Sequence, residues 1–249
     1  MIAADVIAAL ALPADSLVNQ RVPKKLLVEN GAPTPGDKRQ ISEGIEELLW
    51  IAALKPNTIG VPEYRDASHE VVEIAVLSLT LRPVARTERL VELIHRAIPY
   101  PVFLISEQAN VMVLSLARKR LAQNEAGRVV LEEAPIMCSL DATLCANEWL
   151  VKLTLAALPR THLLALYEGW IAALEALQAG TITGKVVLPA DSEAQASRHQ
   201  ALADHARLQR NIAVLRARAQ KEKQVNRRVD LNLEIKRLEV ELCRIASGL

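Results

Sequence analysis

The chain has 249 residues, of which 51% are hydrophobic and only 3% aromatic, so its core must be built from aliphatic side chains. The formal net charge of +1 excludes the overall basicity of many free-standing DNA-binding domains, although it leaves room for a local basic patch. The three cysteines form no C-x-x-C pair, which argues against a zinc ribbon. We expect Cys138, Cys145 and Cys243 to be reduced thiols.

The N-terminal residues are apolar, and residues 2–11 predict a short helix that ends near Pro13. No Lys or Arg precedes this apolar run, which argues against a secretory signal peptide. The sequence also lacks a run of about 18 apolar residues, the length that a membrane-spanning helix requires. We therefore expect a cytoplasmic protein.

A basic stretch at residues 18–25 is followed by a loop rich in Gly and Pro. Basic side chains lie on both sides of this loop and could gather to hold a phosphate or an acidic partner. They are Arg21, Lys24, Lys25, Lys38 and Arg39. Ordinary solvated surface charge is the alternative interpretation.

Helical and strand patterns alternate in the next hundred residues. Helices are predicted at residues 37–54, with Asp37 as the N-cap, and at residues 86–98. Strands are predicted at residues 69–81, 102–106, 111–116 and 128–132. Apolar residues on both faces of the first of these strands indicate a central position in a sheet. The order predicts an α+β fold for residues 1–180, with a small mixed sheet flanked by helices.

The rest of the chain is predicted to be helical. Helices are expected at residues 141–158, capped by Asp141, and at residues 162–178. A linker at residues 181–191, with Gly184 and Pro189, leads to residues 192–249, which contain no Gly before Gly248. This extension is expected to form a helical hairpin or a coiled coil.

The extension carries two patterns that point to binding. Apolar residues at alternating steps of four and three predict a seam that packs on the preceding helix, on the same seam of a second copy, or in a groove of another protein: Leu231, Ile235, Leu238, Leu242, Ile245 and Leu249. Basic residues upstream could lie along nucleic-acid phosphates: Arg210, Arg216, Arg218, Lys221, Lys223, Arg227 and Arg228. A solvated helix face is the alternative explanation for this charge.

No complete catalytic site is visible in the sequence. The carboxylates of Glu63, Asp66, Glu70 and Glu73 could hold Mg²⁺ in a restriction-type nuclease, where a lysine two residues after an acid activates water. The residue two positions after Glu73 is Ala75, so the lysine of such a site is missing. Phosphate-binding loops and metal-ligand histidine spacings are also missing, so we predict no cofactor and no metal.

Several stretches in combination resemble a bacterial family of domains of unknown function, numbered 4391. They are VNQRVPKK at residues 18–25, DKRQISEGIEELLWIAALKPNTIGVP at residues 37–62, the strand EVVEIAVLSL, LIHRAIPYPVFLI at residues 93–105 and NRRVDLNLEIKRLEVEL at residues 226–242. The resemblance covers nearly the whole chain. It implies a role beside a helicase or DNA methyltransferase in a restriction-like phage-defence locus, and it carries over no catalytic residue.

Three functions are compatible with these features. The leading hypothesis is a non-catalytic accessory subunit that binds a helicase or DNA methyltransferase. The second is a degenerate or cryptic metal-dependent nuclease, and the third is a free-standing nucleic-acid-binding protein. The C-terminal helices could also form a homodimer.

Overall fold

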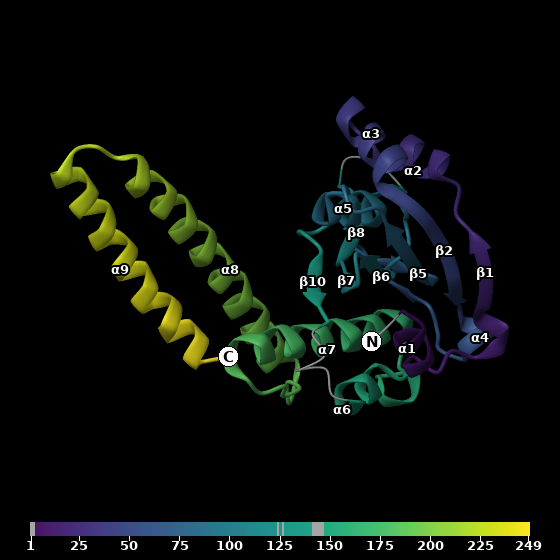
Figure 1. Ribbon diagram of the computed structural model, residues 1–249. Coiled ribbons are helices and arrows are strands. Elements are labelled where there is room, and N and C mark those ends of the chain that lie inside the picture. The colour runs from purple at the N-terminus through teal and green to yellow at the C-terminus, as the bar shows by residue number, and fades with distance from the viewer. Residues whose placement is uncertain (1–2, 124, 126, 141–146) are drawn as a thin grey trace. The chain divides into compact units, whose positions relative to one another are not determined.

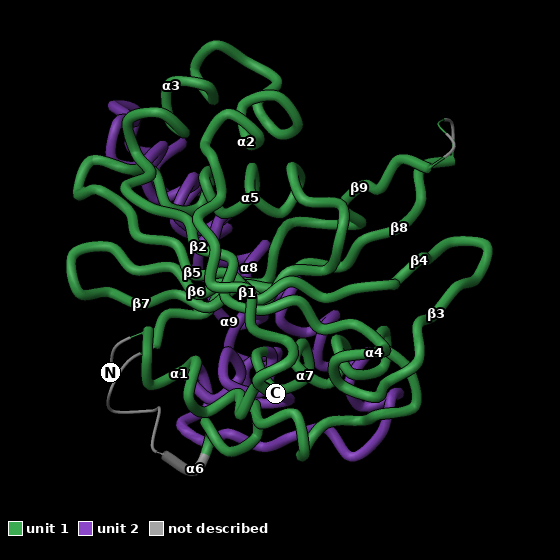
Figure 2. The backbone as a smooth tube through the Cα atoms, turned by 90° about the vertical axis from the view of Figure 1, so that its right-hand side faces the viewer, with its two compact units in different colours: residues 1–174 green, residues 175–249 purple. Residues whose placement is uncertain are grey.

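The structure, a computed structural model, describes residues 3–123, 125, 127–140 and 147–249, but not the side chains of Asn147 and Glu148 (Figure 1). Residues 1–174 and residues 175–249 form two compact units (Figure 2). No helix among the described residues is long and apolar enough to cross a membrane.

A six-stranded sheet organises the first unit, with strand order β1-β2-β5-β6-β7-β10. The strands are β1 (Leu17–Arg21), β2 (Ile45–Leu54), β5 (Ile74–Leu81), β6 (Val102–Gln108), β7 (Val111–Leu116) and β10 (Ile136–Ser139). Neighbours are antiparallel except β5 and β6, which are parallel because helix α5 (Thr87–Ala97) connects them. This mixed sheet with flanking helices confirms the predicted α+β class.

Two short antiparallel ribbons extend from the first unit, residues 1–174, which we call the sheet unit. One pairs β3 (Tyr64–Arg65) with β4 (Glu70–Val71), and the other pairs β8 (Lys119–Leu121) with β9 (Val129–Leu131). The single strand predicted at residues 69–81 is therefore divided between two sheets. A hairpin turn joins β6 to β7, and Ala109 and Asn110 adopt the positive φ values, 47° and 68°, that a tight two-residue turn requires.

Helices cover both faces of the sheet (Figure 2). Helices α2 (Lys24–Gly31), α3 (Pro35–Gly44) and α5 lie on one face. Four buried side chains of α5 at helical spacing pack there against the strands: Leu90, Val91, Leu93 and Ile94. Helices α1 (Ala3–Ala9) and α4 (Pro56–Ile59) and the first half of α7 (Leu163–Thr183) lie on the other face.

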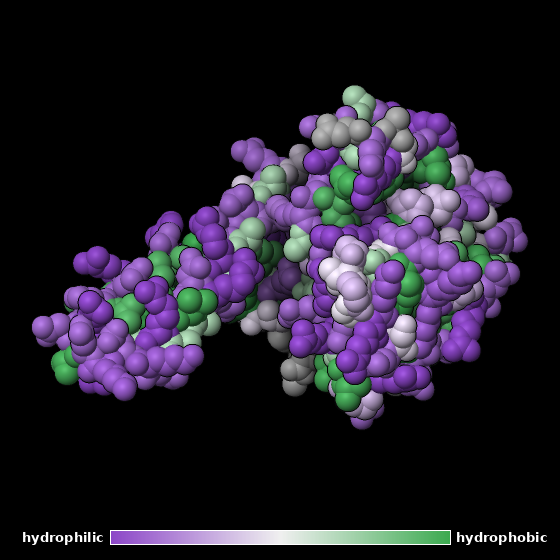
Figure 3. Space-filling view, turned by 90° about the horizontal axis from the view of Figure 1, so that it is seen from above, coloured by the Kyte–Doolittle hydropathy of each residue, from purple (hydrophilic) through white to green (hydrophobic). Residues whose placement is uncertain are grey.

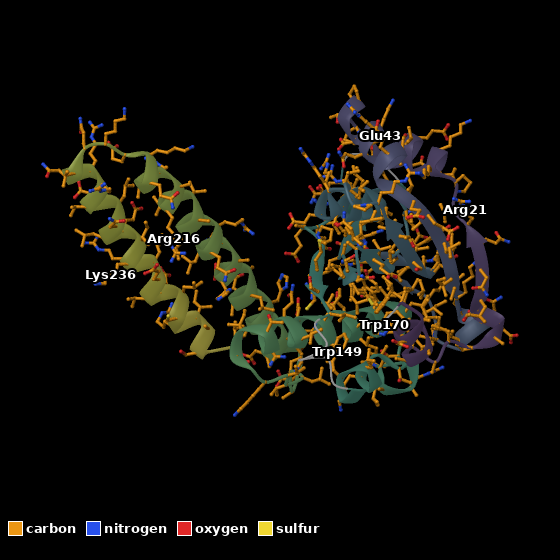
Figure 4. The ribbon with its side chains drawn as sticks, viewed as in Figure 1. Arg21, Glu43, Trp149, Trp170, Arg216 and Lys236 are labelled. Carbon is orange, nitrogen blue, oxygen red and sulfur yellow. The ribbon has the colours of Figure 1, made fainter. Side chains whose placement is uncertain are left out.

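The few aromatic side chains anchor α7 to its face of the sheet. The rings of Phe103 and Trp170 meet edge to face, with centroids 4.9 Å apart. The buried Tyr167 hydroxyl donates to the carbonyl oxygen of Val102 and accepts from the backbone N–H of Ala117, each at 2.9 Å. Trp149 is also buried, and its indole N–H donates to Ala173 (Figure 4). Burial of these rings is stable because each polar atom has a partner.

The helix predicted at residues 37–54 is wrong in its second half. Helix α3 ends at Gly44, and residues 45–54 form β2. The Thr34 hydroxyl caps the helix by accepting from the backbone N–H of Asp37, so Asp37 lies within the first turn. The apolar residues of β2 fit a helix and a strand buried on both faces equally well. Hydrogen bonding with β1 and β5 makes this segment a strand.

Within the described part of the helix predicted at residues 141–158, the α-helix is confirmed at residues 147–150 and is wrong after them. Asp141 and Cys145 lie outside the described residues. The segment after them consists of α6 (Asn147–Leu150) and the 3-10 turns η2 (Val151–Leu153) and η3 (Leu155–Ala157). These two turns bury Leu153, the last residue of η2, and Leu155, the first residue of η3.

The second unit is a helical hairpin preceded by the end of α7, which continues to Thr183. Asp191 caps the N-terminus of helix α8 (Ser192–Lys221), because its carboxylate accepts a hydrogen bond from the Ala194 N–H at 2.8 Å. Helix α9 (Val225–Ser247) returns beside α8. Their interface buries Ile212, Leu215, Ala219 and Ile235, and three further seam residues pack on this cluster: Leu231, Leu238 and Leu242. Of the two arrangements that the sequence left open, the structure has the hairpin.

Candidate nucleic-acid interface

The reversal between α8 and α9 occurs without Gly or Pro. Glu222 leaves the helical conformation, with φ −74° and ψ 124°, and its backbone N–H still donates to Arg218. Its side chain accepts a hydrogen bond from the Gln224 N–H at 2.9 Å. Such a local side-chain hydrogen bond competes with helix continuation, so Glu222 helps to end α8 here.

Basic side chains surround this reversal. All are exposed, and none forms an ion pair with another described residue: Arg218 and Lys221 of α8, Lys223 of the turn, and Arg227 and Arg228 of α9. Glu222 is the one acid between residues 218 and 228. We call these five residues the basic tip. Because they are close in sequence on both sides of one turn, their charges reinforce one another.

The N-terminus of α9 adds to this positive potential. Gln224 stands at the N-cap position, and its side chain makes no capping hydrogen bond. The first turn of a helix leaves N–H groups without helical partners and carries a partial positive charge. Phosphate groups bind well at such helix starts, so the basic tip combines side-chain charge with free backbone donors.

Helix α8 extends the positive surface along one face. Arg210, Val214, Arg218 and Lys221 are spaced by four, four and three residues, which places them on the same side of the helix. Val214 is 58% exposed, so this face points away from α9. From Arg210 to Lys221 the helix is about 17 Å long. A duplex of that length carries about ten phosphate charges.

Arg216 differs from the other predicted basic residues. Its guanidinium donates to Glu239 of α9 across the hairpin, at 2.6 Å. Figure 4 shows Arg216 between the two helices and Lys236 on the outer side of α9. The structure therefore places Arg216 in a pair that joins the helices.

A comparison with protein families identifies the chain. The model of the family described as domain of unknown function (DUF4391) matches residues 10–242. The chain belongs to this family. The DUF4391 match includes α8 and most of α9, so the hairpin is part of the family domain. No curated protein and no solved structure matches the chain.

The N-terminal basic residues of this DUF4391 chain are mostly engaged within the first unit. Arg21 pairs with Glu47 at 3.8 Å, Lys25 with Glu29 at 3.7 Å, and Arg39 with Glu43 at 2.9 Å. Lys24 donates to the backbone carbonyls of Ser42 and Ile45, which ties α2 to the end of α3. Lys38 is exposed and forms no ion pair with a described residue. Local carboxylates thus neutralise most of this cluster.

The four acids considered for a nuclease site also have partners in the chain. Arg65 pairs with Glu63 at 3.2 Å and with Glu70 at 3.1 Å. Asp66 accepts from the Ser68 and His69 backbone N–H groups, both at 2.6 Å, which lowers the pKa of its carboxyl group.

The fourth acid, Glu73, is buried and pairs with Lys55 at 3.0 Å. Lys55 follows β2, so the cation next to this acid comes from a neighbouring strand. Within the described part of the chain, no three His, Cys, Asp or Glu side chains are arranged to hold a metal ion.

Sequence reasoning missed the uncapped start of α9 and the internal pairing of Arg216. The sequence contains a partial indication of the first, because Gln224 is not one of the residues that commonly cap helices. The second depends on which residue of α9 lies opposite Arg216, and that is set by the packing of the hairpin.

Proposed function

We propose that this DUF4391 chain is an accessory binding protein that holds nucleic-acid phosphates with the basic tip of its α8–α9 hairpin. The observation that carries the proposal is the set of five exposed basic side chains at one helix reversal, without ion-pair partners among the described residues. The uncapped N-terminus of α9 lies in the same place. Unpaired cations beside free N–H groups are suited to phosphate oxygens.

Binding of this kind is independent of base sequence. Residues 192–249 contain no Phe, Tyr or Trp on which a base could stack. Contacts to phosphate fix the position and orientation of a protein on nucleic acid but do not read bases. An accessory subunit would therefore take its sequence selectivity from a partner. The family resemblance supports a helicase or a DNA methyltransferase as that partner.

The test is binding of a fluorescently labelled DNA duplex at fixed, near-physiological salt, measured by anisotropy. The variant replaces Lys221, Arg227 and Arg228 of the tip by Gln. The control replaces Lys236, Arg237 and Arg244, which are exposed residues further along α9, also by Gln. Both variants lose one Lys and two Arg, so they have the same net charge.

The tip variant is expected to bind more than about tenfold more weakly than the wild type, because each phosphate that is no longer neutralised keeps its counterions. The control should stay close to the wild type. Equal weakening in both variants would show a general charge effect, and equal binding by all three proteins would refute the proposal.

A further inference from the structure

A buried lysine lies in the unit of residues 1–174. Lys119 of β8 is only 9% exposed. Its ammonium group donates to the carbonyl oxygens of Ile98, at 2.6 Å, and Tyr100, at 2.5 Å, just after the end of α5. An ammonium group has three donors, and these two bonds leave one of them unused.

No carboxylate compensates the charge of Lys119 within the described residues, since none forms an ion pair with it. Burial lowers the pKa of Lys119 to about 7. A buried charge without a counter-ion is costly, and bound anions or neutralisation reduce this cost. The position therefore favours an anion from outside the chain.

His95 of α5 is a second buried group with unused hydrogen-bonding capacity. Its Nε2 lies 3.0 Å from the hydroxyl oxygen of Ser115, whereas its Nδ1 has no partner. Burial, and then the charge of Lys119, hold the pKa of His95 well below its ordinary value, so the ring is neutral. When the Ser115 hydroxyl donates to Nε2, the Nδ1 carries the proton and becomes a donor.

Both side chains line one pocket of about 720 Å³. Its walls come from the ends of α2 and α5 and from the β8–β9 ribbon, and they include the apolar residues Ala32, Pro33 and Leu131. Arg96 and Arg128 also line the pocket, but they already pair with Glu92 and Glu125, at 2.7 Å and 2.5 Å. Lys119 is therefore the lining cation that lacks a carboxylate partner.

We propose that this pocket binds a small organic monoanion, a carboxylate with an apolar body, whose oxygens accept hydrogen bonds from Lys119 Nζ and His95 Nδ1. The carboxylate supplies the missing counter-charge and satisfies the unpaired imidazole nitrogen. The apolar body lies against the aliphatic walls, as in most small-molecule sites. All residues that line the pocket belong to the unit of residues 1–174.

The probe is benzoate, with benzamide as a neutral molecule of nearly the same shape, and binding to the full chain is measured by titration calorimetry. Benzoate is expected to bind at least about tenfold more tightly than benzamide, because a charged hydrogen bond is stronger than a neutral one. Lys119→Met should abolish this preference. Lys38→Met, which removes an exposed lysine of α3 that does not line the pocket, should preserve it.

Ligand binding to the wild-type protein also tests the proposed site, without any substitution. In histidine NMR spectra, benzoate should shift the ring resonances of His95 more than benzamide does at the same concentration. Acetate and inorganic phosphate complete the series, and both are expected to bind more weakly than benzoate because they lack the apolar body. Equal affinity for benzoate and benzamide, absence of benzoate binding, or tighter binding of phosphate would overturn the proposal.

Discussion

The sheet unit and the hairpin bury their apolar side chains to different extents. In the sheet unit, Leu77 and Leu104 are completely buried between helices and strands. In the hairpin, Ile212 and Ile235 keep 4% and 8% of their surface exposed, and Val240 on the outer side of α9 is 69% exposed. Figure 3 shows a largely hydrophilic hairpin surface with separate hydrophobic patches. A two-helix hairpin has one interface to bury, so most of its surface is available for binding.

The largest expected effect is a truncation in the sheet core. Leu104→Ala should lower the free energy of unfolding by about 2–5 kcal/mol, because it removes a fully buried side chain and leaves a cavity. Leu238→Ala, at the half-buried hairpin interface, should cost clearly less. Denaturant unfolding of both variants measures the difference, and equal losses would contradict the contrast between the two units.

A charged side chain placed in the α8–α9 interface tests whether this interface stabilises the hairpin. Ile235→Asp should cost about 2–3 kcal/mol, since it places a carboxylate in the α8–α9 interface and loses apolar burial. The matched control is Val240→Asp on the exposed side of the same helix, which should change stability by less than about 0.5 kcal/mol. Thermal melting followed by circular dichroism distinguishes them, and similar melts would show that the seam does not hold the hairpin together.

A smaller effect is expected from an ion pair at the edge of the sheet core. Arg89 donates to both carboxylate oxygens of Asp37, at 2.8 Å and 2.9 Å, and with the Thr34 hydroxyl it lowers the pKa of Asp37 from 3.8 to about 2. A lowered carboxyl pKa contributes stability above pH 3.8 that is lost as the pH falls towards 2.

Asp37→Asn should therefore be less stable than the wild type at neutral pH, and the difference should shrink between pH 4 and pH 2. Denaturant unfolding across this range is the measurement. A constant difference at every pH would mean that the charge of Asp37 is not the source of the stability.

The smallest effect concerns the pair between α8 and α9. Arg216 and Glu239 are 60% and 40% exposed, and exposed pairs contribute about 0–1 kcal/mol. Arg216→Gln should shift the melting temperature slightly, and added salt should reduce the shift. A large, salt-independent loss would show that Arg216 has a structural role beyond this pair.

The sequence predicted those helices and strands whose hydrophobic pattern fits only one type of secondary structure. Helix α5 and strands β6 and β7 lie within a few residues of their expected positions. Residues 45–54 were predicted as helix because their apolar spacing suits both structures, and pairing with β5, which begins twenty residues later, determines the strand. The short β1 was missed because its exposed polar residues resemble a loop.

The candidate sites also contain some features that the sequence reveals and others that only the fold determines. Charge counting found the basic tip, since its residues lie close together in the sequence. It could not separate Arg216 from Arg218, because the pairing of Arg216 depends on the register between two helices. Lys119 lies in a stretch of basic residues, ARKR, and only the fold shows that this lysine is buried beside His95.

The salt dependence of DNA binding tests the central claim most directly. The logarithm of the affinity falls linearly with the logarithm of the salt concentration, with a slope of about 0.9 for each phosphate that the protein neutralises on a duplex. The slope of the variant lacking Lys221, Arg227 and Arg228 should be shallower than that of the wild type by about 0.9 for each phosphate that the variant no longer neutralises. The control variant lacking Lys236, Arg237 and Arg244 should keep the wild-type slope. Identical slopes for the wild type and the tip variant would contradict binding by the basic tip.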